Sequence, residues 1–141
     1  MVRFEEWPQN KENLMQKNTL ILIGTAIALS LSANMATADT AAGQAVFKKC
    51  HVCHSAEPGK KKVGPSLYGV VGRTPGTLEG YKYSTSMIDF GKTGAVWDAA
   101  TLDTYLTKPR ATVTKTKMIF PGLKKEADRT AVIAYLESLH D

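Results

Sequence analysis

One pentapeptide, Cys50-His51-Val52-Cys53-His54, constrains this 141-residue chain more than any other feature. The pattern C-x-x-C-H is the attachment signal of a c-type haem. Two thiols three positions apart on one helical turn can reach the two vinyl groups of one porphyrin, and the adjacent imidazole can then bind the iron. Cys50 and Cys53 are the only two cysteines of the chain. The motif therefore predicts one haem c, joined to Cys50 and Cys53, with His54 as the proximal iron ligand.

Two other interpretations of the motif remain open but are weaker. A C-x-x-C pair can be a redox dithiol, but no strand–helix pattern typical of a thioredoxin-like site lies near it. It can also be half of a zinc site. A closed zinc site needs four ligands, and the only histidine outside the motif is His140, next to the end of the chain.

The N-terminal part of the sequence predicts export. Residues 19–31 form an apolar run of 13 residues, TLILIGTAIALSL, which is shorter than the roughly 20 residues that a membrane-spanning helix needs. Ala36-Thr37-Ala38 follows as an A-x-A cleavage site. We therefore expect residues 1–38 to be a signal peptide, cleaved after Ala38, and residues 39–141 to lie in the periplasm. An uncleaved anchor is the alternative.

The translation start is a second open point of this segment. The first 18 residues carry three basic and three acidic side chains, instead of the positive n-region of a typical signal peptide. Met15-Gln16-Lys17 would lead directly into the apolar run. Translation from Met15 is therefore an alternative to translation from Met1.

Residues 39–141 have the length of one domain, and their pattern predicts a mostly helical one. We expect a helix over 39–54, a helix that Asp98 caps and that runs to Thr107, and a last helix from about Glu126 to Leu139. The segments 55–73, 72–94 and 110–117 are rich in glycine, proline or polar residues and are expected to be loops and turns. No alternating strand pattern is present.

The sixth ligand of a haem iron has few candidates in this sequence. His51 is held inside the attachment loop, and His140 is next to the terminus, where order is least expected. Met118 lies in a loop that continues into Phe120 and a Pro-Gly turn, whereas Met87 lies in a polar stretch of small residues. The residues alone favour Met118 and leave Met87 as the next candidate.

The order of separate motifs resembles the class I c-type cytochromes, in particular the small soluble cytochrome c and cytochrome c2 family. The resemblance covers roughly residues 43–139. It rests on CHVCH followed by GPSL (64–67), GR (72–73), GYKY (80–83), VW (96–97), LDTYL (102–106), KTKMIF (115–120) and VIAYL (132–136). It implies an all-α, single-domain fold in which the N- and C-terminal helices cross, with helices and loops wrapped around one covalent haem.

The resemblance also implies roles for single residues. Met118 would be the sixth ligand, and the Pro65 carbonyl would bind the ring nitrogen of His54. The remaining roles would be a propionate site of Arg73, Tyr83 and Trp97, a second propionate contact at Thr116, a hydrogen bond from Tyr105 to the methionine sulfur, and an aromatic side chain, Phe120, beside the exposed haem edge. Gly43 and Phe47 would lie where the first helix crosses the last, near Tyr135.

The function implied is that of a periplasmic electron carrier and not of an enzyme. Its donor would be a bc1-type complex and its acceptor an oxidase or a photosynthetic reaction centre. The chain carries a formal charge of +5, and Lys49, Lys117, Lys124 and Lys125 are expected to form a docking patch around the haem edge. We expect a monomer with no permanent membrane anchor and no nucleic-acid partner. A haem peroxidase or a gas-binding cytochrome with an open axial site is the alternative.

Overall fold

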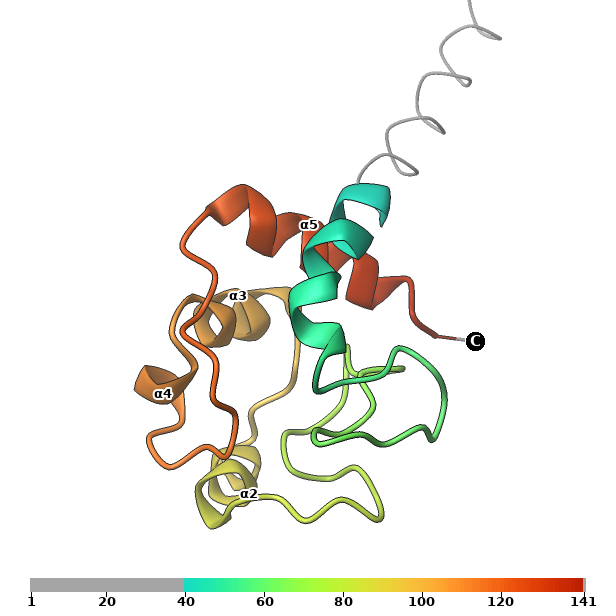
Figure 1. Ribbon diagram of the computed structural model, residues 1–141. Helices are drawn as coiled ribbons and strands as arrows, with labels where there is room; N and C mark the ends of the chain where they lie inside the picture. Colours follow the sequence, from blue (N-terminus) through green and yellow to red (C-terminus); the bar gives the residue numbers. More distant parts are fainter. Residues whose placement is uncertain (1–39, 141) are drawn as a thin grey trace, which may run out of the picture. The chain divides into compact units, whose positions relative to one another are not determined.

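The computed structural model describes residues 40–140 and builds them from helices and irregular segments (Figure 1). The chain divides into two units, Met1–Thr37 and Ala38–Asp141. The predicted signal peptide, its cleavage site and the Met15 start lie outside the described residues. The helices are an N-terminal helix over residues 40–51, α2 (Thr85–Lys92), α3 (Ala99–Thr107), α4 (Pro109–Thr112) and α5 (Glu126–Glu137). Residues 40–140 contain no strand, so the all-α prediction is confirmed.

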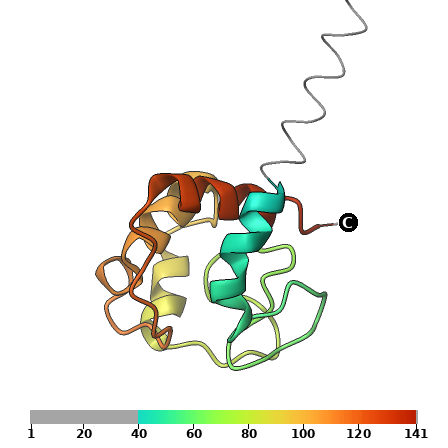
Figure 2. The same cartoon turned by 45° about the horizontal axis from the view of Figure 1, so that its top comes forward.

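The N-terminal helix crosses α5, as the two views in Figures 1 and 2 show. Gly43 is buried at the crossing, where an added Cβ would overlap the Ala131 carbonyl oxygen and lie 2.6 Å from the Tyr135 Cβ. One turn further along, the ring centroids of Phe47 and Tyr135 are 5.1 Å apart. The predicted contact of Gly43 and Phe47 with the Tyr135 region is therefore confirmed. The absence of a side chain at Gly43 is what lets the two backbones approach.

Helices α3 and α5 supply much of the apolar core. In α5 the buried residues Val132, Ile133 and Leu136 repeat with helical spacing and face one side. In α3 the buried residues are Leu102, Tyr105 and Leu106. Burying each large apolar side chain contributes about 1.5–3 kcal/mol, so this contact holds α3 in place, and with it Tyr105.

A partly buried ion pair joins the same two helices. The Arg129 Nε lies 2.7 Å from the Asp103 carboxylate, and the Arg129 side chain is only 11 % exposed. Its Nη1 also donates to the Leu123 and Lys124 carbonyls. Arg129 therefore connects α5 to α3 and to the segment that leads into α5.

Two short helices were not predicted. Residues 72–94 were expected to be turns, but they contain α2, whose N-cap Ser84 accepts a hydrogen bond from the Met87 amide. Residues 110–117 were expected to be loop, but their first residues belong to α4, which has Pro109 at its first position. Helix α2 could not be predicted from the helix propensity of its residues, because packing against the rest of the domain stabilises it. Met87 and Gly91 are buried, and Gly91 lies directly against the Pro75 carbonyl.

The other predicted boundaries agree closely. The Asp98 carboxylate accepts from the Thr101 amide at 2.7 Å and caps α3, which ends at Thr107 as expected. The last helix ends at Glu137, two residues before the predicted Leu139. Across residues 40–140 we find no helix with the length and apolar character needed to span a membrane.

Candidate haem site

A cavity of about 300 Å³ opens in the domain, and every residue predicted to contact a haem lines it. These residues come from seven separate places in the chain: Cys50, Cys53, His54, Pro65, Arg73, Tyr83, Trp97, Tyr105, Thr116, Met118 and Phe120. Leu67, Val70, Leu102, Leu106 and Leu136 supply apolar wall. The fold thus brings together residues that are as many as 70 positions apart in the sequence.

The two thiols lie where the N-terminal helix ends. Cys50 is in the last turn of that helix, and its carbonyl accepts hydrogen bonds from the Cys53 amide (3.0 Å) and the His54 amide (2.9 Å). This tight turn brings both thiols and the imidazole to one cavity. Burial raises the pKa of the Cys50 thiol, while the nearby Lys49 ammonium opposes the shift.

His54 is held in one tautomer. Its Nδ1 lies 2.8 Å from the Pro65 carbonyl oxygen, and because a carbonyl can only accept, Nδ1 must carry the proton. The other nitrogen, Nε2, keeps a free lone pair in the neutral ring, which is the form that binds a metal. Burial lowers the pKa of the imidazole, although the Pro65 bond partly opposes this. The fixed tautomer and the lowered pKa both keep Nε2 without a proton, as an iron ligand requires. The predicted contact between His54 and the Pro65 carbonyl is present.

Gly64 shapes the site in a way that the sequence analysis missed. A Cβ at this position would lie 2.5 Å from Cε1 and 2.7 Å from Nδ1 of His54. Any side chain would therefore push the imidazole away from the Pro65 carbonyl. A Gly-Pro pair is an ordinary turn signal, so nothing in the sequence distinguishes this glycine from a turn glycine.

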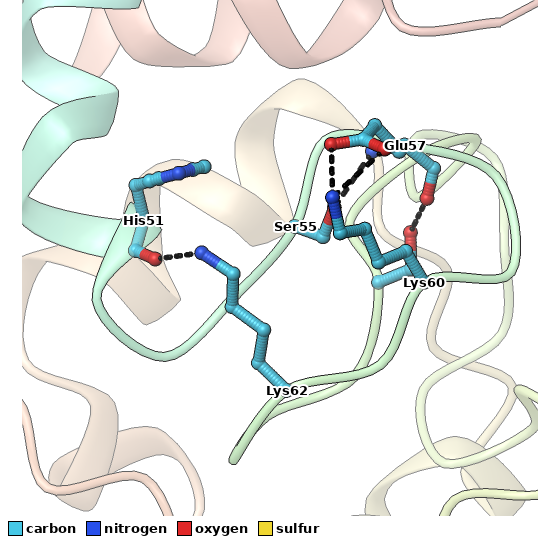
Figure 3. Close-up of polar contacts among 6 residues, drawn as sticks. His51, Ser55, Glu57, Lys60 and Lys62 are labelled. Atoms are coloured by element: carbon cyan, nitrogen blue, oxygen red, sulfur yellow. Dashed lines mark hydrogen bonds and ion pairs between the residues drawn. The ribbon is translucent and has the colours of Figure 1, made fainter.

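The loop that presents Pro65 is braced by its own polar groups (Figure 3). Glu57 is at the centre: its carboxylate binds Lys60 at 2.7 Å, its amide donates to Ser55 Oγ at 3.0 Å, and its carbonyl accepts from Ser66 Oγ at 2.7 Å. Lys62 reaches back to the His51 carbonyl at 2.5 Å. Ser55 and Ser66 are almost completely buried. These bonds fix the path of the chain between His54 and Pro65.

Met118 lies beside two hydroxyl groups. The Tyr105 hydroxyl is 3.9 Å from the Met118 sulfur and 3.3 Å from Thr116 Oγ1, and Thr116 Oγ1 accepts from the Met118 amide at 3.3 Å. Tyr105 and Thr116 are buried, and burial raises the pKa of the Tyr105 phenol. The thioether is therefore positioned by a small hydrogen-bonded group, including the contact with Tyr105 that the resemblance implied.

Met87 differs from its sequence-based description. Its surroundings in the sequence are polar, but the side chain is buried on α2 and lines the same cavity as Met118. Both sulfur candidates therefore face one site. Only Met118 lies beside the Tyr105 hydroxyl.

One corner of the cavity is polar. The Arg73 guanidinium donates to the Ser66 carbonyl at 3.1 Å and to the Tyr68 carbonyl at 3.3 Å. The phenol of Tyr83 is close enough to sense the Arg73 charge, although burial raises the pKa of Tyr83 overall. Trp97 is buried beside Tyr105, with ring centroids 4.9 Å apart. A cation next to phenol and indole donors suits a carboxylate, the acidic group that a haem carries.

The predicted lysines fall into two groups. Lys49 and Lys117 line the cavity, as does Phe120. Lys49 is paired with Asp128 in the first turn of α5 at 3.2 Å, and the Lys117 ammonium donates to the Lys82 carbonyl at 2.6 Å. Lys124 and Lys125 are exposed and lie directly before α5, outside the cavity lining.

The residues present fit a covalent haem by their chemistry. Two thiols, an imidazole with a free Nε2, a thioether, apolar walls and a cationic corner surround one cavity. Each matches one part of the group: the vinyl carbons, the iron, the flat apolar ring and the propionates.

Comparison with known proteins gives the same assignment. The family model described as cytochrome c matches residues 40–140. The chain is 48% identical to cytochrome c2 of Afifella marina over 99 residues, which are 70% of this chain and 80% of that protein. It is 43% identical to cytochrome c2 of Rhodomicrobium vannielii over 127 residues, which are 89% of this chain and 98% of that protein. The structure of cytochrome c2 from Rhodospirillum centenum superimposes with a TM-score of 0.68 at 37% identity, covering 72% of this chain and 98% of that one.

These findings confirm the class I fold, the haem and the family that the motifs indicated. The chain belongs to the cytochrome c family and is an electron-transfer protein with a covalently attached haem c.

Proposed function

We propose that this protein is a one-electron shuttle whose haem is joined to Cys50 and Cys53 and whose iron is bound by His54 and Met118. The observation that carries the proposal is that one cavity gathers both thiols, an imidazole oriented by Pro65 and a thioether beside Tyr105. When bound, the haem supplies the Fe(II)/Fe(III) couple, and a methionine ligand raises its potential.

The task of the chain is to keep the two ligands in place during the change of charge. The Pro65 carbonyl holds the His54 ring, and Tyr105 and Thr116 hold the Met118 segment. Because these partners are set by the fold, His54 and Met118 would keep their positions in both oxidation states of a bound haem, which would allow electron transfer with little rearrangement. Arg73, Tyr83 and Trp97 would bind one propionate and Thr116 would contact the other, while Phe120 would lie at the exposed edge of the haem. With His54 and Met118 both bound to it, the iron would offer no free position to a substrate, so we propose no enzymatic activity.

Carbon monoxide distinguishes this proposal from an open axial site. The reduced protein is expected to keep its visible spectrum under carbon monoxide, because the Met118 sulfur would already hold the sixth position. A pyridine haemochrome spectrum establishes haem c in the same sample. Rapid and complete formation of a carbon monoxide adduct at neutral pH would favour a gas-binding protein or a peroxidase instead.

The location and the partners are further parts of the proposal. The apolar run 19–31 and the Ala36-Thr37-Ala38 site support cleavage after Ala38 and a periplasmic mature domain that begins at Asp39. A bc1-type complex as donor and an oxidase or reaction centre as acceptor suit a carrier of this family. The lysines Lys49, Lys117, Lys124 and Lys125 would attract the acidic surfaces of such partners.

Charge reversal tests this docking patch. Lys124→Glu combined with Lys125→Glu is expected to slow electron transfer to an acidic partner by about 10-fold at low salt, because steering by opposite charge is lost. The effect should shrink near physiological ionic strength, where the screening length is about 8 Å. Stopped-flow measurements over a range of salt concentrations provide the rates. These two lysines lie outside the cavity lining, so the visible spectrum should not change.

The matched control replaces Lys92, on α2, and Lys108, directly after α3, by glutamate. It changes the net charge of the protein by the same amount. Neither lines the cavity. An equal slowing by both double variants would mean that only the overall charge matters and would contradict a patch.

A further inference from the structure

The second thioether of the cavity, that of Met87, has no part in the proposed ligation of the iron. Its side chain is buried on α2 and lines the cavity. The packing of α2 holds it there: Ser84 Oγ accepts from the Met87 amide at 3.2 Å at the start of the helix, and Gly91 lies directly against the Pro75 carbonyl further along. Met87 is therefore a fixed part of the cavity wall.

Ring contacts place this part of the wall near Tyr105. Met87 and Phe90 are three positions apart on α2 and so share one face of the helix. The ring centroids of Phe90 and Trp97 are 5.8 Å apart, and those of Trp97 and Tyr105 are 4.9 Å apart. Met87 and Tyr105 are both buried and line the same cavity. The helix face that carries Met87 is thus turned toward the side of the cavity where Tyr105 meets Met118.

The two hydroxyl groups beside Met118 can satisfy each other and the sulfur. Thr116 Oγ1 accepts from the Met118 amide and lies 3.3 Å from the Tyr105 hydroxyl. With the Thr116 proton on the Tyr105 oxygen, the Tyr105 proton is available for the sulfur, 3.9 Å away. Within residues 40–140, no buried side-chain nitrogen or oxygen lacks a hydrogen-bond partner. Sulfur is a weak acceptor, so an additional oxygen atom at this place would compete with it for the Tyr105 proton.

We propose that Met87 keeps competing oxygen atoms away from the Tyr105 hydroxyl and is thereby a positioning residue for the hydrogen bond from Tyr105 to the Met118 sulfur. The inference rests on the proposed ligation by Met118 and adds a determinant of the reduction potential. A hydrogen bond to the sulfur draws electron density away from it, and a weaker donor favours the reduced iron. An apolar side chain at position 87 therefore raises the potential, and it does so through Tyr105.

Met87→Gln is the direct test, because glutamine is unbranched and close to methionine in length but carries an amide oxygen. At a fixed solution potential, we expect the ratio of oxidised to reduced haem-loaded protein to rise about fivefold, the effect of one net hydrogen bond. A redox titration measures this ratio. The near-infrared sulfur–iron band should remain, because Met118 is unchanged.

Two controls separate the oxygen atom from packing and from composition. Met87→Leu changes the same wall without bringing an oxygen and should leave the potential unchanged. Ile88→Gln places the same amide on the same helix, at a residue that is 40% exposed and outside the cavity lining, and should also have no effect.

The route through Tyr105 is tested in a Tyr105→Phe background. There, the effect of Met87→Gln should shrink to less than about twofold, because no hydroxyl proton is left to divert. An unchanged potential in Met87→Gln, an equal fall in either control, or a fall that persists in full in the Tyr105→Phe background would overturn the inference.

Nuclear magnetic resonance of the reduced parent protein tests the inference without any variant. The Tyr105 hydroxyl proton should show Overhauser contacts to Thr116 and none to bound water. Bound water in contact with this proton would overturn the role of Met87. Failure of the proposed function would show earlier, as a parent protein without a haem c spectrum or without the near-infrared sulfur–iron band.

Discussion

Replacing Met118 by leucine is expected to lower the reduction potential by at least about 0.1 V, a fraction of the roughly 0.8 V range that axial ligands set. Leucine keeps nearly the volume of methionine but cannot bind iron, so water or a nitrogen base would take the sulfur's place. The near-infrared sulfur–iron band of the oxidised protein should disappear. A redox titration monitored in the visible and near-infrared regions measures both effects in one sample.

Met87→Leu is the matched control, since it removes the other sulfur that lines the same cavity. Met87 is buried on α2, and a swap of similar volume should cost less than about 1.5 kcal/mol of stability. The near-infrared band should remain in this variant. A band that survives Met118→Leu and is lost in Met87→Leu would reverse the assignment of the sixth ligand.

Local chemistry explains why so much of the site could be predicted. Cys50, Cys53 and His54 lie within one turn, so their spacing alone specifies the attachment chemistry. The cap at Asp98 and the apolar stripe of α5 are equally local signals. For Met118, by contrast, the residues alone left Met87 open, and only the resemblance to a family indicated that Tyr105 lies beside the sulfur of Met118. The bonds from Thr116 Oγ1 to the Tyr105 hydroxyl and the Met118 amide were not predicted.

The features that were missed depend on contacts between distant segments. Helix α2 looked like part of a run of turns because glycines occur within it and on both sides of it. Its helical form depends on burying Met87 and Gly91 against residues near Pro75. Gly64 looked like a turn glycine because the ring it accommodates, His54, is ten positions earlier. The Tyr81 hydroxyl donates to the Val63 carbonyl, 18 positions earlier. No periodicity or motif within a window of the sequence contains this information.

Gly43 also depends on a contact between distant segments, but here the resemblance to a family predicted the contact. This glycine yields the largest expected effect on stability. Gly43→Ala should destabilise the protein by about 1–3 kcal/mol, the usual cost of forcing an extra group into a packed contact. The added Cβ would overlap the Ala131 carbonyl, which belongs to the backbone of α5 and cannot turn aside as a side chain could. Denaturant unfolding followed by circular dichroism measures the change.

The control Ala42→Gly shows whether helix propensity or the helix crossing decides the sign of the change in unfolding free energy. Ala42 is the neighbour of Gly43 in the same helix but is exposed, so Ala42→Gly should cost only the difference in helix propensity, up to about 1 kcal/mol. If propensity alone mattered, Gly43→Ala would stabilise the protein by a similar amount. If the helix crossing decides, both variants lose stability, and Gly43→Ala loses more because the clash exceeds the gain in propensity. A stabilised Gly43→Ala would show that the N-terminal helix and α5 have room to separate, and that the helix leading to Cys50 and His54 is not locked by this contact.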